Sequence, residues 1–363
     1  MRLYKSELYK LCSRKRFLFG TVGVLTLFLI YFWVQLTSIS SMVDGVQAWG
    51  YQAVQMDRAI TKDWKGTLTD EKVAQIADLY GFPHIIKENY NNFVDFNFLN
   101  TLIHKRLSDG YINTWRDYKI ATHIIPIADS ILGEFAQESG MPVILEYYYG
   151  WYVFLEVLTF SILAASIFII FIVSPIFSEE IHIGTLQLLF TTKEGKGMDI
   201  AAKIAAALTV SIGIFAIIVL LDFLLCGVVF GLDGLDCFTG LVLEDWGYGP
   251  LASMPIRTYI PIVLISDFIG ILLLCAISLF LSAFFSSPYP TVVVNTLCWS
   301  APFILRIFFH KLYLFQYMSP VYMVLHYVHL ETDWMGIRQK ILIFAIVTTI
   351  VLIVASVRRY RIR

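Results

Sequence analysis

The sequence predicts an all-α membrane protein with six transmembrane helices. Of its 363 residues, 58% are hydrophobic and only 15% are charged, and the mean hydropathy is +0.70. Soluble domains average about 45–50% apolar and about 25% charged residues. Six apolar runs are long enough to cross roughly 30 Å of hydrocarbon. They lie at about 17–36, 152–177, 201–230, 258–285, 290–309 and 340–357.

The basic residues predict the orientation of these runs. Residues 1–16 carry six basic residues against one acid, and the tail 358–363 carries four arginines. Residues 37–150 hold nine basic and fourteen acidic residues. Because lysine and arginine concentrate on the cytoplasmic side, we expect a multi-pass protein of the plasma membrane with both termini in the cytoplasm. We also expect a bacterial origin. No small-x-small cleavage site follows the first run, so we expect it to be a retained anchor.

The first element, residues 1–16, is predicted to be an amphipathic elbow helix. Its apolar residues fall on one face at helical spacing, with lysines elsewhere, as in a helix that lies in the inner membrane interface. That face comprises Leu3, Tyr4, Leu8, Leu11 and Cys12, and we place Lys5, Glu7, Lys10 and Arg14 outside it. The alternative is a plain basic anchor for the span at 17–36.

Residues 37–151 are predicted to form a helical extracellular domain. The stretch "LTDEKVAQIADLYG" indicates a helix with Thr69 as its N-cap, acids in its first turn and Gly81 as its stop. "VDGVQAWGYQAVQMDRAI" and "FNFLNTLIHKRL" also suit helices. No alternating pattern typical of strands is evident. Aromatic residues at 146–152 indicate the level at which the chain enters the bilayer.

The five-span core is predicted to occupy 152–357, with a cytoplasmic loop at 178–200. Residues 312–330 could form a seventh transmembrane span, because they are apolar and long enough to cross the membrane. Pro320 in the middle would break a helix. A seventh span would also place the terminal arginines outside. We therefore expect re-entrant helices before the sixth span, buried against protein.

Four ionisable residues fall inside the predicted spans, all toward the outer side. Charges there cost free energy unless they pair or face water. We expect Arg306 to pair with Asp267 or Asp222 at the outer end of a translocation path; a purely structural ion pair is the alternative. The four residues are Glu156, Asp222, Asp267 and Arg306.

The sequence contains no motif of a known catalytic or metal site. It lacks a P-loop, an H-E-x-x-H pattern and a G-x-S-x-G pattern. His326 and His329 are three apart but have no evident third ligand, so we expect no metal. The five cysteines indicate neither zinc spacing nor a disulfide framework. We expect no enzyme activity, no cofactor in this chain and no nucleic-acid partner.

The loop at 178–200 carries the most informative pattern. Glu180 is followed by Gly184-Thr185-Leu186, by Leu188-Leu189 and by Lys196, between two spans. With the elbow helix, six spans and re-entrant helices, this pattern resembles the ABC-2 type permeases, the membrane subunits of one class of ATP-driven exporters. A departure is Thr192-Lys193, where members of that family often carry a proline. The resemblance covers about two thirds of the chain.

The resemblance implies how the protein would work. It would pair with a second permease, identical or related, and with two separate ATPase subunits that bind ATP and Mg²⁺, within the lipid bilayer. The leucines would dock in a groove of the ATPase, and the glutamates would pair with its basic residues. An amphipathic turn resting on the inner leaflet is the alternative. The coupling residues are Glu179, Glu180, Gly184, Thr185, Leu186, Leu188 and Leu189.

The expected function is export of a hydrophobic or amphipathic molecule, such as a peptide antibiotic, a drug or a lipid-like compound. That cargo rests on family analogy. Two other functions stay open at the level of sequence. One is a secondary transporter coupled to ions through its intramembrane acids. The other is a membrane sensor or immunity protein whose external domain binds a ligand.

Overall fold

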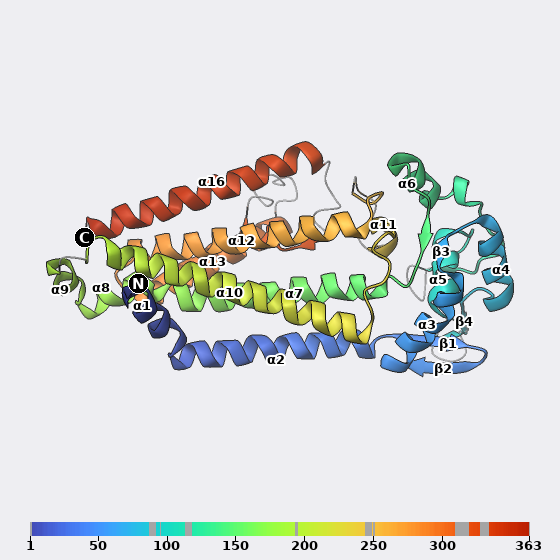
Figure 1. The fold of residues 1–363 in the computed structure, drawn as a ribbon, viewed down its shortest axis with the longest axis horizontal. Helices are drawn as coiled ribbons and strands as arrows, with labels where there is room; N and C mark the ends of the chain where they lie inside the picture. Colours follow the sequence, from blue (N-terminus) through green and yellow to red (C-terminus); the bar gives the residue numbers. More distant parts are fainter. Residues whose placement is uncertain are drawn as a thin grey trace.

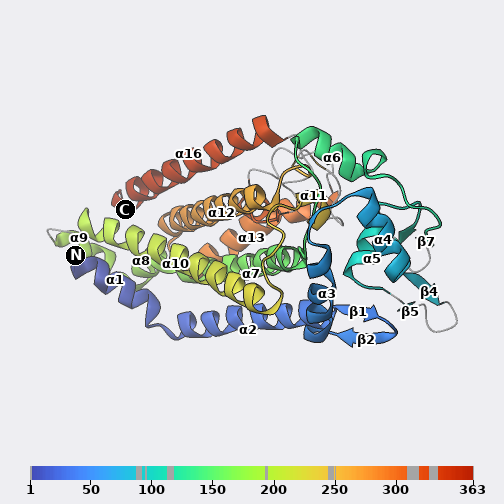
Figure 2. The same cartoon turned by 45° about the vertical axis from the view of Figure 1, so that its right-hand side comes forward.

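The computed structural model describes residues 2–86, 92–94, 96–112, 118–192, 195–243, 249, 251–308, 319–326 and 334–362. A bundle of long helices carries a smaller domain, formed mainly by residues 38–148, at one end (Figure 1). We call this the domain end. Both chain termini lie at the opposite end, which we call the tail end (Figures 1 and 2).

Five helices are long and apolar enough to cross a membrane, and they match five of the six predicted runs. The sixth run, 290–309, also forms a helix, α13 (Pro288–Phe308), which packs beside α12. The five are α2 (Lys15–Thr37), α7 (Tyr149–Val173) with its continuation α8 (Pro175–Ile183), α10 (Met198–Val229), α12 (Ile256–Phe284) and α16 (Trp334–Arg361).

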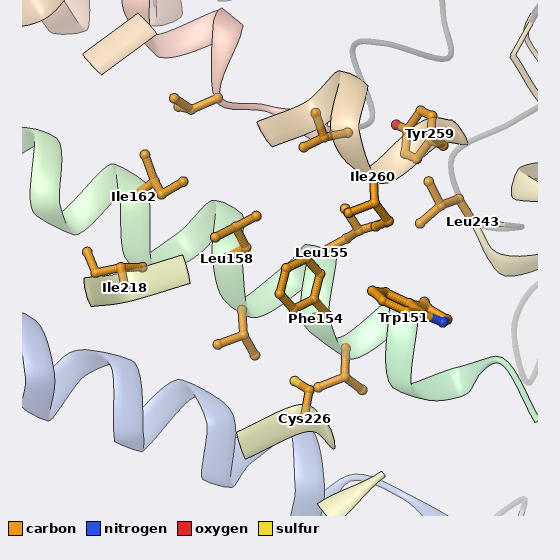
Figure 3. Packing of buried hydrophobic residues seen from close by; sticks show 14 of the residues in the cluster. Trp151, Phe154, Leu155, Leu158, Ile162, Ile218, Cys226, Leu243, Tyr259 and Ile260 are labelled. Atoms are coloured by element: carbon orange, nitrogen blue, oxygen red, sulfur yellow. The ribbon is translucent and has the colours of Figure 1, made fainter. Parts of the chain in front are cut away.

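Helices α7 and α12 form the centre of the bundle, and most of their apolar windows are buried. Side chains of α7 pack against α10 on one side and α12 on the other (Figure 3). Helices α2, α10 and α16 instead leave large apolar side chains exposed, such as Trp33, Phe223 and Val351. An exposed apolar surface of this extent is stable only against lipid or another protein.

Residues 319–326 lie along α12 and are all buried. Pro320 begins the short helix α15 (Pro320–Met323), and Ser319 before it is an extended N-cap, so no helix runs through position 320, in agreement with the prediction that this proline breaks a helix. Proline is tolerated at the first helical position, where no N–H is needed. A Cβ on Gly270 of α12 would lie 3.1 Å from the Cβ of Met323, so glycine permits this contact. The rest of 312–330 lies outside the described residues.

The small domain combines helices with paired strands, so the prediction of a purely helical domain was wrong. The helices are α3 (Tyr51–Trp64), α4 (Asp70–Tyr80), α5 (Phe98–Arg106), the 3-10 turn η1 (Ile127–Asp129) and α6 (Ile131–Ser139). The antiparallel pairs are β1 (Ser40–Val43) with β2 (Val46–Trp49), β3 (Gly66–Thr67) with β8 (Ile144–Leu145), β4 (His84–Ile86) with β5 (Asn92–Val94), and β6 (Tyr111–Ile112) with β7 (Tyr118–Lys119).

The loop of the first hairpin, β1–β2, shows why the prediction of a helix failed there. Val43 pairs with Val46 across a loop of two residues, Asp44 and Gly45, whose φ angles are 51° and 76°. Asp-Gly is a preferred sequence for a two-residue hairpin loop, since both positions need positive φ. We read this stretch as part of a helix, but α3 begins only at Tyr51.

The predicted helix after Thr69 is confirmed. The Thr69 hydroxyl accepts a hydrogen bond from the Lys72 backbone N–H, and the helix ends at Gly81, whose φ is +64°. Val73 and Ile76 are fully buried, as the spacing predicts. The predicted helix around "FNFLNTLIHKRL" is also present as α5, and it begins with a capping box between Asn97 and Asn100.

A buried carboxyl joins three elements of the domain. Asp57 of α3 accepts hydrogen bonds from the Ser41 hydroxyl at 2.6 Å and the Phe98 backbone N–H at 3.1 Å. Burial raises its pKa to about 6, although both hydrogen bonds favour the ionised form. The hairpin, α3 and the start of α5 therefore meet at one titratable group.

We expect Asp57→Asn to flatten the pH dependence of stability. The folded state keeps the Asp57 proton up to about pH 6 and the unfolded chain loses it near pH 4, so stability falls as pH rises through this window. The difference between pH 4 and 7 is on the order of 3 kcal/mol. Denaturant unfolding in detergent at several pH values measures it. Exposed Asp63 of the same helix is the control; an equal effect of Asp63→Asn would contradict the assignment.

We expect Gly20→Ala to destabilise the contact between α2 and α7. A Cβ at Gly20 would lie 2.2 Å from Cε2 of the Phe168 ring, which is buried, so the ring must move. Overpacking of this kind costs about 1–3 kcal/mol. Gly23, on the same helix, has nothing within 4 Å of its added Cβ and is the matched control. Thermal unfolding in one detergent compares the two; equal melting temperatures would disprove the close approach.

Candidate functional site

The predicted coupling loop begins as a continuation of α7. Pro175 starts α8 after Ser174, and the Ser282 hydroxyl of α12 accepts the backbone N–H groups of Phe177 and Ser178 at 2.9 and 3.1 Å. Helix α8 ends at Gly184, whose φ is +80°, a conformation that favours glycine. The chain then forms the short helix α9 (Leu186–Thr191) at the tail end (Figure 2).

Glu180 of α8 is buried where four helices meet. One of its oxygens accepts a hydrogen bond from Lys10 at 2.9 Å and lies 3.3 Å from the Lys203 ammonium of α10. The other accepts the Tyr360 hydroxyl of α16 at 2.8 Å. Lys10 belongs to α1 (Arg2–Cys12), which packs against α10. One carboxylate thus joins α1, α8, α10 and α16.

Lys203 occupies the interior of this cluster and is fully buried. Its ammonium pairs with Asp199 one turn earlier and lies 3.9 Å from the carboxylate of Glu7. Three carboxyls and two ammonium groups therefore share one site. Burial raises the pKa of Glu7, and Lys203 and Lys10 offset this only in part. We call these residues the tail cluster: Glu7, Lys10, Glu180, Asp199, Lys203 and Tyr360.

Glu179 forms a second, more exposed group. Its carboxylate accepts a hydrogen bond from Arg14 and another from Arg16 at 3.3 Å. We expected Glu179 and Glu180 to pair with basic residues of another subunit. In the structure both carboxylates pair within this chain instead, because α1 and the start of α2 lie directly beside α8.

The apolar residues of the loop fall into two groups, one buried against the bundle and one exposed to solvent. Leu186 is buried and Leu189 is half-buried, whereas Leu188 is 72% exposed and Ile183 is 65% exposed. Gly184 and Thr185 lie between them, and the Thr185 hydroxyl bonds back to the carbonyl of Glu180 at 3.3 Å. Ile183 and Leu188 are therefore exposed on the surface of the loop, whereas Glu180 anchors the loop in the buried tail cluster.

Sequence reasoning missed most of the tail cluster. Glu7 lies at positions i+4 and i−4 from Leu3 and Leu11, so it belongs to the apolar face of α1 from which we excluded it. That spacing was a usable signal. Tyr360 stood within a basic tail and gave no signal. Asp199 and Lys203 are four apart on a helix, a spacing typical of an ion pair.

The three described acids within the spans have separate neighbours. The Asp222 carboxylate accepts the Cys226 thiol at 3.4 Å, and Asp267 lies close enough to Arg338 for its charge to act on the carboxylate. Both acids are buried, in the half of the bundle nearer the domain. The side chain of Arg306 lies outside the described residues, so its predicted pairing stays a prediction.

Arg338 and His326 are polar residues of the bundle that we had not predicted to interact with its acids. Arg338 donates to the Ser266 hydroxyl at 2.8 Å and to the carbonyl of Ile262 at 2.6 Å. Glu156 has one oxygen 3.5 Å from Nε2 of buried His326, which also contacts the Thr159 hydroxyl at 2.8 Å. His329 lies outside the described residues.

A lateral groove of about 1190 Å³ runs between α2, α7 and α13. Its walls are almost entirely apolar, and Gly20 and Gly23 line it on the α2 side. Arg16, which also binds Glu179, lies at the tail end of the groove. This apolar groove therefore ends beside the loop.

Comparison of the chain with models of protein families, with curated proteins and with solved structures gives no match. Among the described residues, no group of three or more His, Cys, Asp or Glu side chains is placed to hold a metal ion. The loop, the tail cluster and the groove are therefore the features that point to a function.

We expect Lys203→Met to be strongly destabilising. The change removes the ammonium that Glu7, Glu180 and Asp199 share and leaves Lys10 as the one ammonium of the tail cluster; breaking a buried ion pair costs about 3–5 kcal/mol. Lys5→Met, on the exposed face of α1, is the matched control. Adding Glu7→Gln to Lys203→Met removes one charge and should restore part of the loss. Thermal unfolding in detergent measures all three; equal melting temperatures for the two lysine variants would refute the cluster's role.

Proposed function

We propose that this chain is the permease subunit of an ATP-driven exporter of the ABC-2 type. It would work with a second permease and two separate ATPase subunits. The observation that carries the proposal is the tail cluster, which fixes the Glu-x-x-x-Gly-Thr-Leu loop to α1, α10 and α16. In such a transporter, this loop would receive the movement of the ATPase.

The charges explain how a movement of the loop would reach the membrane. Displacing α8 pulls Glu180 away from Lys10, Lys203 and Tyr360 unless α1, α10 and α16 follow. Separating buried charges costs several kcal/mol, so concerted movement of the helices is the cheaper response. Ser282 ties the start of α8 to central α12 in the same way. The four helices would respond as one lever.

The exposed part of the loop supports docking of a partner. Ile183 and Leu188 face outward on a short helical turn whose base is held rigidly by Leu186 and Glu180. Apolar side chains on a preformed helical turn suit insertion into a groove of another protein. Because the bundle satisfies the charges of Glu179 and Glu180, the contact with an ATPase would be mainly apolar.

The arrangement of the helices supports six crossings with both termini in the cytoplasm. The termini lie at the same end, which requires an even number of passes (Figure 1). Helix α12 ends at the tail end, and α16 also ends there, so α13 would carry the chain back toward the domain. The buried segment 319–326 would be part of the re-entrant region. The domain would then lie outside the cell.

The lateral groove supports an apolar or amphipathic cargo. It opens sideways between exposed apolar helices, so a molecule dissolved in the bilayer could enter it without crossing water. Arg16 at the tail end would suit an anionic group on that molecule.

One observation favours a second candidate function, transport coupled to ions. Asp222 and Asp267 are buried within the bundle, and each has a carboxylate oxygen that accepts no hydrogen bond within the described part of the chain. Intramembrane acids of this kind mark proton pathways in some transporters. This candidate predicts transport by the purified chain alone in vesicles with a proton gradient.

We expect Leu188→Asp to abolish recovery of a P-loop ATPase with the protein. A charge at the most exposed apolar position of the loop would oppose docking without disturbing the buried cluster. Affinity purification from native membranes, followed by mass spectrometry, compares the variant with the wild type. Leu79→Asp is the matched control, because Leu79 is 63% exposed on α4 in the domain. If wild type recovers no P-loop ATPase, or all three proteins recover the same amount, the proposal fails.

A further inference from the structure

His104, in the second half of α5, is fully buried inside the small domain. Neither nitrogen of its imidazole ring has a hydrogen-bond partner within the described part of the chain. On one side the ring faces Phe82, with the two ring centroids 6.1 Å apart. Buried polar groups are nearly always hydrogen-bonded, so this imidazole is an exception that requires an explanation. None of the features used for the proposed function involves it.

Residues 107–112 and 118–125 follow α5 and lie side by side; we call them the two arms. Asp109 of the first arm joins them. Its backbone N–H donates to the carbonyl of His123 at 3.1 Å. Its carboxylate accepts the backbone N–H of His123 at 2.9 Å and the ammonium of Lys119 at 2.8 Å. The two arms are therefore linked to each other independently of His104.

The arms also cover the His104 ring. Ser108 holds the first arm in place, because its hydroxyl donates to the backbone carbonyl of His104 at 2.6 Å and accepts the N–H of Gly110 at 3.0 Å. A Cβ at Gly110 would lie 2.3 Å from Cε1 of His104 and 2.7 Å from the backbone nitrogen of Ala121 in the second arm. Glycine permits this close approach of backbone to ring. The ring is shielded from solvent as long as the arms stay in contact with it.

The charges near His104 do not compensate for its burial. Burial lowers the pKa of His104; the carboxylate of Asp109 partly offsets this, and the ammonium of Lys105 adds to it. Lys119 and backbone N–H groups of the second arm hold the pKa of Asp109 well below its usual range, so Asp109 stays ionised in mild acid. The exposed side chain of His123 has its Nδ1 3.7 Å from the Asp109 carboxylate.

We propose that His104 is a pH-sensitive switch: its protonation releases the two arms from α5, so that the small domain changes conformation in mild acid. A protonated imidazole has two N–H donors, and the covered site offers neither of them an acceptor within the described part of the chain. The charged ring must therefore reach water, which requires Gly110 to move away from it. In the proposed topology the switch would face the outside of the cell.

The direction and size of the effect follow from proton linkage. Once the arms are released, His104 has an ordinary histidine pKa of about 6.5, above its value in the covered site, so release is favoured as the pH falls below this value. Between pH 7.5 and pH 5 the equilibrium for release should rise by up to about thirtyfold. Asp57 titrates in the same range, with a pKa of about 6, but its proton stabilises the folded domain, so it cannot cause release in acid.

Hydrogen exchange of the full-length protein in phosphatidylcholine nanodiscs, followed by mass spectrometry, measures release of the arms. Exchange is corrected for the intrinsic effect of pH, and the readout is the ratio of protection at pH 7.5 to that at pH 5. We expect a ratio of about thirty for peptides from 107–112 and 118–125. Peptides from α7 should give a ratio near one. The experiment needs neither an ATPase nor a cargo, so its outcome is independent of the proposed function.

Variants assign the response to His104. His104→Phe and His104→Leu cannot take up a proton, so the ratio for the arms should fall to near one in both, whatever their absolute protection. His123→Gln removes the histidine side chain of the second arm and should respond to pH as the wild type does. Gly110→Ala should lower the protection of the arms already at pH 7.5, because its Cβ would collide with the His104 ring.

Three results would overturn the proposal. The first is protection of the arms that does not change with pH in the wild type. The second is a wild-type ratio in both His104 variants, since another group would then be the sensor. The third is loss of the response in His123→Gln, which would assign the switch to the exposed histidine instead.

Discussion

The burial of Lys203 is the constraint on which the tail end of this protein depends. An ammonium group cannot remain charged in a protein interior without compensating carboxylates, and Glu180 and Asp199 supply them at short range. Supplying them requires α8 and α10 to converge, Glu7 and Lys10 bring α1 to the same point, and Tyr360 brings α16 there. The arrangement of the loop, of α1 and of the last helix follows from satisfying one buried cation.

The acidic residues in the rest of the bundle do not form a shared network like the tail cluster. Glu156, Asp222 and Asp267 lie apart from the tail cluster, each with a few polar neighbours rather than a shared network. Arg338 divides its hydrogen bonds between a serine and a backbone carbonyl of α12. The half of the bundle near the domain is therefore held together mainly by apolar packing around α7 (Figure 3). Electrostatic linkage between helices concentrates at the tail end.

The sequence predicted the long elements well, because hydrophobic length is a direct requirement of crossing a membrane. Five apolar runs coincide with helices that meet this requirement, and the cap at Thr69 located α4. It failed for the short strands for two reasons: β3 and β8 are about 80 residues apart, and the local Asp-Gly signal between β1 and β2 was read as part of a helix. Of the tail cluster, only Glu180 was predicted as functional, since packing against α10 and α16 decides which polar residues are buried together.

The tail cluster also has a consequence for biosynthesis. Its members come from α1, α8, α10 and α16, so the charges at residues 7, 10, 180, 199 and 203 are all made long before Tyr360. Until the last helix arrives, one oxygen of Glu180 lacks its buried donor, and water must hydrate that side of the cluster. Closure of the cluster and docking of α16 are therefore a single late event.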